Sequence, residues 1–163
     1  MAEQTTHFLF GSTNDSSCIP TEMPPTFDPL RYLEATPLEP LTNIKALEGQ
    51  YLAEVLEVWE CYDDFPLHNS PILLRFEEID LLVVSDDTGK LSLWLGAIDT
   101  EQCLDGFQVR PENDNEDQPE YCLYWMSHPE LQELVGQQAY SITRTENEEI
   151  QIVFDEMDVL FFE

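Results

Sequence analysis

The alternation of apolar and polar positions predicts strands along most of the chain after residue 50. Apolar residues recur at every second position, or in short runs, at 72–76, 79–85 and 90–95. Further short strands are expected at 121–126, 138–145, 150–154 and 158–162. Asp86-Asp87-Thr88-Gly89 predicts a hairpin turn, with the glycine where φ is positive.

One segment from the middle of the chain returns near its end. Leu47-Glu48-Gly49-Gln50 reappears 87 positions later as Leu134-Val135-Gly136-Gln137, and 72–81 reappears 78 positions later as 150–159. Self-similarity of this kind indicates two copies of one supersecondary unit. Each copy is expected to be a short helix, capped by Thr42 or Ser127 and ended by its glycine, followed by a meander of three antiparallel strands.

The stretch 51–62 fits two patterns. Its apolar residues form a helical stripe opposite a row of glutamates. Its counterpart 138–145, however, has side chains that alternate in type from one position to the next and includes several β-branched residues. This favours a strand in both copies. The predicted fold class is therefore α+β and β-rich. Two tandem related units, 42–96 and 127–162, form one antiparallel sheet or two facing sheets.

Residues 1–40 are predicted to be an arm attached to a single globular domain at 41–163. Six of the eleven prolines lie in this arm, and proline excludes a sheet interior or a long helix. Apolar residues such as Phe27 and Tyr32 favour a strap laid over the domain rather than a free linker. Residues 110–120 contain five acids and no large apolar residue, so they predict an acidic loop between the two units.

The net charge of the chain limits the classes of molecule that it can bind. It has 163 residues, 34 acids and six bases, for a net charge of −28. Such a surface repels nucleic acid and anionic membranes and attracts basic proteins. No basic N-terminal region precedes an apolar core of signal-peptide length, and no apolar run reaches about 18 residues. We therefore expect a cytoplasmic protein that contacts neither nucleic acid nor membrane directly. Its oligomeric state is not predicted.

The sequence contains little that could carry out a reaction. Cys61 and His68 form the one candidate thiol–imidazole pair, while His128 is expected at a helix start. The segment 113–117 resembles the start of a calcium loop, but Gln118 stands where glycine is needed and Tyr124 where glutamate is needed. We expect no enzyme, no cofactor and no metal site. The four cysteines, none in a CxxC pair, are typical of reduced thiols, with two disulfides as the alternative.

The carboxylates gather at the ends of predicted strands, where binding surfaces commonly lie. Three aromatic residues follow the densest acidic run, and aromatic anchors ringed by acids suit a binder of a basic protein. The predicted partner-binding residues are Asp63, Asp64, Glu77, Glu78, Asp86, Asp87, Glu112, Asp114, Glu116, Asp117, Glu120, Tyr121, Tyr124 and Trp125. The alternative for the carboxylates is a charged surface that serves only solubility, and the alternative for the three aromatic residues is a place in the core. Trp59 and Trp94 are expected in the core.

The Leu-x-Gly-Gln motif and the later Phe-Glu/Asp-Glu motif, with the meander PILLRFEEIDLLVVSDDTGKLSLW, resemble those of small acidic immunity proteins of bacterial toxin systems. The resemblance covers about 42–96 and 128–162. It implies a non-catalytic protein that occludes a cognate toxin, and with the acidic charge of the chain we expect a basic toxin of the nuclease type. The alternatives are a DNA mimic from a phage or mobile element that inhibits DNA-binding or defence proteins, a structural or assembly subunit, and an enzyme that uses Cys61 and His68.

Overall fold

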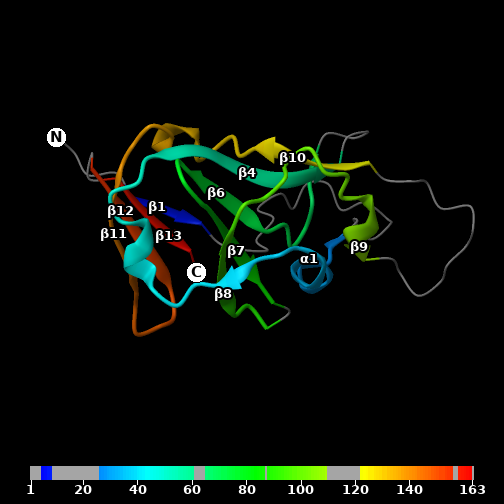
Figure 1. Cartoon of the computed structure of the whole chain (residues 1–163), viewed down its shortest axis with the longest axis horizontal. Coiled ribbons are helices and arrows are strands. Elements are labelled where there is room, and N and C mark those ends of the chain that lie inside the picture. Colours follow the sequence, from blue (N-terminus) through cyan, green and yellow to red (C-terminus); the bar gives the residue numbers. More distant parts are fainter. Residues whose placement is uncertain are drawn as a thin grey trace, which may run out of the picture.

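The computed structural model describes residues 5–8, 26–60, 65–86, 88–109, 122–155 and 158–162. These residues form two main sheets, a small two-stranded sheet and a single α-helix, so the fold is β-rich, as the hydrophobic pattern predicts. Figure 1 shows the four-stranded sheet at the left, the helix and β9 at the right, and the larger sheet between them.

The larger sheet is organised around its longest strand, β4 (Leu52–Glu60). Its order is β10-β4-β6-β7-β8-β3, β5 also pairs with β4, and all of these pairings are antiparallel. The other strands are β3 (Glu39–Pro40), β5 (Phe65–Pro66), β6 (Ile72–Phe76), β7 (Asp80–Ser85), β8 (Leu91–Gly96) and β10 (Leu123–Ser127). The strand predicted at 51–62 is therefore confirmed, because β4 is hydrogen-bonded on both sides.

The smaller sheet has the order β1-β13-β12-β11. Its strands are β1 (Thr5–Phe8), β11 (Ala139–Arg144), β12 (Ile150–Phe154) and β13 (Val159–Phe162). β11, β12 and β13 form an antiparallel meander, as predicted, whereas β1 pairs in parallel with β13 at the edge. The two-stranded sheet joins β2 (Thr26–Phe27) to β9 (Gln108–Val109).

Two apolar clusters lie on opposite faces of the larger sheet. The first contains residues of both main sheets, such as Leu74 and Leu81 from the larger and Ile152 and Phe154 from the smaller. The second includes Trp125 of the larger sheet and lies beneath the segment that contains the α-helix. Period-two alternation explains the division, because neighbouring strand residues such as Leu73 and Leu74 point to opposite faces.

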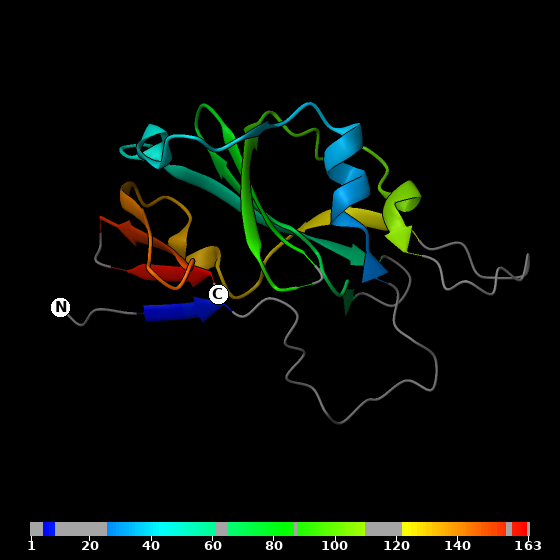
Figure 2. The same cartoon turned by 90° about the horizontal axis from the view of Figure 1, so that it is seen from below.

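The described part of the predicted arm packs against the larger sheet. Its helix α1 (Pro29–Ala35) begins where Asp28 Oδ1 accepts a hydrogen bond of 3.2 Å from Arg31 N, and Pro29 occupies the first turn. Phe27 and Tyr32 are buried, and the Tyr32 ring meets the Trp125 ring edge-on at 6.1 Å between centroids. Figure 2 shows α1 lying across the larger sheet on the side away from the smaller one.

The helices predicted at the start of each unit are corrected by the structure. Both are 3₁₀ turns, η1 (Ile44–Leu47) and η3 (Gln132–Leu134), as is η2 (Asp105–Phe107). Asn43, not Thr42, caps η1 by accepting a hydrogen bond from Lys45 N, and Ser127 is the last residue of β10 rather than a cap. Each segment is too short for α-helical hydrogen bonding to propagate. His128 accordingly lies at a strand end, not at a helix start.

Candidate functional site

The predicted partner-binding acids do not form one surface in the described part of the chain. Glu77 and Glu78 are exposed in the turn between β6 and β7, while Asp86 follows β7 at its other end. The six extended residues of β7 lie between the two groups, so they are about 20 Å apart. The remaining acids of the prediction lie outside the described residues: Asp63, Asp64, Asp87, Glu112, Asp114, Glu116, Asp117 and Glu120.

Asp86 has a local structural role in its hairpin. Its Oδ1 accepts hydrogen bonds from Thr88 N (2.9 Å), Thr88 Oγ1 (2.6 Å) and Lys90 N (2.9 Å), and these bonds, led by that from the Thr88 side chain, hold the pKa of Asp86 below its usual range. Gly89 in the same turn has φ +83°, as predicted. The side chain therefore closes the turn between β7 and β8.

The predicted aromatic anchors are divided between core and surface. Trp125 is only 7% exposed and belongs to the second apolar cluster, which is the core position that the sequence left open beside a place on the binding surface. Alternation along β10 explains this, because Leu123 and Trp125 point inward and Tyr124 points to the other face. Tyr124 is half-buried, and its hydroxyl donates a hydrogen bond of 3.4 Å to Met126 Sδ. Tyr121 lies outside the described residues.

A different pair of aromatic side chains is exposed where the two main sheets meet. Four backbone hydrogen bonds of 2.7–2.9 Å join the sheets there: Gly49 N to Ala139 O, Ala139 N to Gln50 O, Leu52 N to Gln137 O, and Gly136 N to Leu52 O. Gly49 and Gly136 reach these positions with φ +89° and +92°, which side chains rarely allow. An isolated bridge between Tyr51 and Gln138 lies at the centre of the junction.

Tyr51 and Tyr140 project outward from this junction. Leu52 and Ala139 point into the first core cluster, so the residues that flank them point away from it. Tyr140 is 75% exposed and Tyr51 is 44% exposed, and both are among the few large apolar side chains exposed in the described chain. Tyr51 lies across from Gln138, two residues before Tyr140, so the two tyrosines are diagonal neighbours at the junction.

Four exposed carboxylates adjoin the junction from which these tyrosines project. Glu48 adjoins Gly49, whose carbonyl accepts a hydrogen bond of 2.6 Å from Gln138 Nε2. The Glu78 amide donates to Gln50 Oε1 at 3.4 Å, and Glu77 precedes it. The Asp155 amide donates to Gln138 O at 3.0 Å. We call the group of Glu48, Tyr51, Glu77, Glu78, Tyr140 and Asp155 the seam patch.

The seam patch contains two of the residues predicted from the sequence, Glu77 and Glu78. Sequence reasoning missed Tyr51 and Tyr140, although a signal for Tyr140 was present. It lies on the polar face of a strand whose inward residues are Ala139 and Ile142. A large aromatic residue on the solvent side of an amphipathic strand is therefore the sequence feature that marks this surface.

A buried acid–imidazole pair is the closest arrangement to reactive chemistry in the described chain. Glu57 and His128 are 7% and 3% exposed, with 3.6 Å between Glu57 Oε2 and His128 Nε2. Glu57 Oε1 also accepts a hydrogen bond of 2.8 Å from Trp59 Nε1. Burial raises the pKa of Glu57 and lowers the pKa of His128, so both shifts favour the neutral forms. Substrate could reach neither group without displacing core.

We expect Glu57→Gln to stabilise the protein at pH 8 and to lose this advantage below pH 4.5. A carboxylate whose folded pKa is raised costs stability once pH rises through that pKa, whereas both states are protonated at low pH. The lowered pKa of His128 has the opposite effect on the pH dependence of stability. The folded protein loses stability as pH falls below about 6.5, because the buried imidazole resists protonation. Urea unfolding at pH 4 to 8 checks this. A variant less stable than the wild type at pH 8 would contradict it.

Arg75 is the most extensively bonded cation of the described chain. Its Nε lies 3.0 Å from Asp80 Oδ1 and its Nη1 3.1 Å from Glu54 Oε2, while its Nη2 donates to Ile98 O at 2.6 Å. Asp80 Oδ2 accepts a second bond, from Ile98 N at 2.8 Å. The hydrogen bond to Asp80 raises the pKa of Arg75. This network fixes the segment after β8 against β6 and β7.

The described ranges contain few groups that could form another class of site. No group of three or more His, Cys, Asp or Glu side chains there could hold a metal ion. Cys103 and Cys122 are free thiols. Half-buried His68 bridges Thr26 through the backbone, while Cys61, its predicted partner, lies outside those ranges. None of the described helices has the length and apolarity needed to cross a membrane. Comparison with known proteins gave no match to a family model, a curated protein or a solved structure.

Proposed function

We propose that this chain is a non-catalytic acidic protein that captures and neutralises a basic partner protein through the seam patch. The observation that carries the proposal is the pairing of two exposed tyrosines with four exposed carboxylates on a rigid junction between two sheets. The carboxylates attract a basic surface from a distance, and tyrosine rings supply contact area at low conformational cost. The backbone bonds of the junction preorganise the patch before the partner arrives.

We further propose that the partner is a nuclease-type toxin and that the protein acts as its cytoplasmic immunity protein. A nuclease must present a basic groove to bind phosphates, so carboxylates held at fixed positions compete for the same groove. The net charge of −28 favours such a partner by long-range attraction. Occlusion needs no catalytic group in this chain, which agrees with the resemblance of its two repeated motifs to those of immunity proteins.

The proposal includes an origin of the junction in two related units. The pairing of Leu52 with Phe76 recurs 87 or 78 positions later as Ala139 with Phe154, and a register shift follows Leu52 and Ala139 alike. The hydrogen bonds Gln50 N to Leu47 O and Gln137 N to Leu134 O also correspond, both at 3.2 Å. The four junction bonds form two equivalent pairs. Gly49 N to Ala139 O corresponds to Gly136 N to Leu52 O, and Ala139 N to Gln50 O corresponds to Leu52 N to Gln137 O. These correspondences support an internal duplication arranged about a local pseudo-twofold axis.

The correspondence changes by one residue at the last turn. Phe76 N donates to Ile79 O, whereas Phe154 N donates to Asp158 O, so the second turn is one residue longer. Leu81 therefore corresponds in space to Leu160, which is buried, and not to Val159, which the sequence alignment suggests. This extra length places Asp155 beside Gln138 in the second copy, so the two copies contribute different side chains to the seam patch.

The test is capture of a basic partner from the native cell with seam-patch variants. We expect Tyr51→Ser/Tyr140→Ser and Glu77→Gln/Glu78→Gln each to reduce partner affinity at least tenfold, because interface aromatics and charges of this kind are common hot spots. Electrostatic capture should also weaken with salt, since exposed charges are screened beyond about 8–10 Å at physiological strength. Affinity is measured by calorimetry, and nuclease activity of the captured partner is titrated to stoichiometry.

The matched control is Glu146→Gln/Glu148→Gln, which removes the same charge from exposed residues in the turn between β11 and β12. Its affinity should stay within about twofold of the wild type, because this turn lies at the other end of β11 from the seam patch. An equal loss of partner affinity in the control would show that the acidic surface acts only through its overall charge and not through the seam patch. Capture of several unrelated DNA-binding proteins, each competed by DNA, would instead indicate a DNA mimic.

A further inference from the structure

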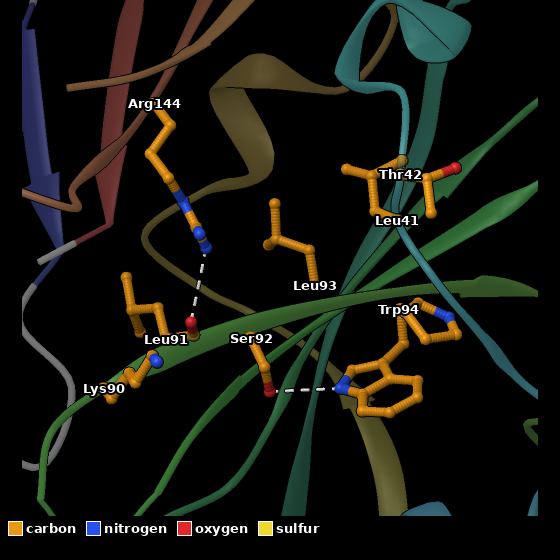
Figure 3. Close-up of a pocket in the computed structure, with 9 residues that line it drawn as sticks. Leu41, Thr42, Lys90, Leu91, Ser92, Leu93, Trp94 and Arg144 are labelled. Carbon is orange, nitrogen blue, oxygen red and sulfur yellow. Dashed lines mark hydrogen bonds between the residues drawn. The ribbon is translucent and has the colours of Figure 1, made fainter.

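A pocket of about 340 Å³ opens at the edge of the larger sheet, and no residue of the seam patch lines it. Strand β3 covers only the end of β8, since Glu39 pairs with Leu95 and Pro40 with Trp94. The chain after Leu41 then turns toward η1, and no described strand pairs with the first part of β8 on that side. Figure 3 shows Leu41 and Thr42 on one side of the pocket, β8 as its floor, and Arg144 reaching in from the smaller sheet.

The lining of this pocket is positively charged, in contrast to the strongly negative protein as a whole. Two of the six basic residues of the chain, Lys90 and Arg144, line it, and none of the described residues of its lining is an acid, although the sequence contains 34. Neither cation has a carboxylate within 4.0 Å in the described chain, in contrast to Arg75 with its two acids. Asp86 lies near Lys90, but its Oδ1 is bonded within the hairpin. Arg144 is therefore the better placed of the two cations.

Polar groups of the strand edge face the same space. Leu93 O accepts the Leu41 amide at 2.9 Å on the outer side of β8, so the N–H and C=O of Leu91, two residues earlier, also face outward. Arg144 Nη2 donates to Leu91 O at 3.4 Å, which holds the guanidinium over the pocket (Figure 3). Its other N–H groups and the Leu91 amide have no hydrogen-bond partner in the described chain. Trp94, whose indole donates to Ser92 Oγ at 3.0 Å, supplies an apolar wall together with Pro40.

We propose that this pocket binds a small organic monocarboxylate with an aromatic or branched apolar body. The carboxylate would accept from Arg144 and Lys90 and from the Leu91 amide, while the apolar body lies against Trp94, Leu41 and Leu93. A guanidinium fork matches the two oxygens of a carboxylate. The volume is at the lower end of the range for small-molecule pockets.

The field of the whole protein favours a small, singly charged ligand over a polyanion. A peptide or phosphate ester that carries several negative charges meets repulsion from the acidic surface beyond the pocket, whereas one charge is compensated locally by the two cations. The uncovered length of β8 is also short, because Leu41 already occupies Leu93 O. An added peptide strand would therefore gain few backbone hydrogen bonds.

An NMR titration tests the proposal with phenylacetate as the probe and its uncharged isostere phenylacetamide as the comparison. We expect phenylacetate to shift the Trp94 indole and Leu91 amide signals with a dissociation constant on the order of 1 mM or tighter, the scale for about ten heavy atoms. Phenylacetamide should bind at least tenfold more weakly. Arg144→Gln should weaken phenylacetate at least tenfold and Lys90→Gln a few fold. The amide spectra of both variants report whether they remain folded.

Lys45→Gln is the matched control, because it removes the same charge from an exposed residue of η1 that does not line the pocket. It should leave phenylacetate binding unchanged. Equal binding of the amide, an equal effect of Lys45→Gln, or no shift at Trp94 and Leu91 up to about 20 mM, well above the expected constant, would each overturn the proposal. Tighter binding of phenyl phosphate would assign the pocket to phosphate esters and overturn the carboxylate class.

Discussion

Replacing Arg75 with methionine should lower the free energy of unfolding by about 3 kcal/mol, as expected when one partner of a buried ion pair is removed. Asp80 is buried and would keep only the Ile98 amide as a partner, while Ile98 O would lose its 2.6 Å donor. The loss is set at the lower end of the usual range because the Arg75 side chain is 26% exposed. Urea unfolding at pH 7 measures it.

The double variant Arg75→Met/Asp80→Asn separates a buried charge from lost packing. Asparagine keeps an oxygen for the Ile98 amide but removes the uncompensated carboxylate, so the double variant should be more stable than Arg75→Met alone. Lys45→Met, at an exposed cation, should change stability by less than about 0.5 kcal/mol. An Arg75→Met variant as stable as that control would show that the network contributes nothing measurable.

Phe154→Ala should cost about 3–5 kcal/mol, the usual range for deleting a fully buried phenyl ring. Phe154 is buried in the cluster that both main sheets share, and its amide, with that of Asp155, fixes the turn beside Gln138. Phe76→Ala should cost a similar amount, because Phe76 pairs with Leu52 as Phe154 pairs with Ala139. Phe154→Leu, which keeps most of the volume, should cost less than about half as much.

Thermal unfolding by calorimetry also tests whether the two sheets unfold together. Because one apolar cluster contains side chains from both, Phe76→Ala and Phe154→Ala should each lower the midpoint of a single transition. Separate melting of the smaller sheet in Phe154→Ala would mean that the junction is not one cooperative core. In that case the seam patch would not be preorganised, and the binding proposal would lose its physical basis.

The strands were predictable because alternation is a property of neighbouring residues. Apolar runs at 72–76 and 150–154 specify extended chain wherever they lie, and Asp86 with Gly89 specifies the turn between two of them. The 3₁₀ turns were predicted as α-helices because a glycine at φ near +90° ends either kind of helix. The difference depends on the hydrogen bonds that the junction requires, and these come from a distant segment of the chain.

The candidate sites were less predictable, because each depends on residues brought together by pairing between distant segments. Glu77 and Asp86 are both acids at loop ends, yet β7 separates them along its length. Trp125 follows an acidic run in the sequence, but the phase of β10 turns it toward Tyr32. Charge and residue type were visible in the chain, whereas the face on which each side chain lies was not.

The sequence by itself determined that this protein is β-rich and strongly acidic, since local alternation and composition fix these properties. Only the tertiary structure decided that Tyr51 meets Gln138 beside Tyr140, and that Arg144 lies over the uncovered edge of β8. The physical reason is that a strand's sequence fixes its period but not its neighbours. Register and sheet order, set by packing two apolar faces together, choose which distant residues share a surface.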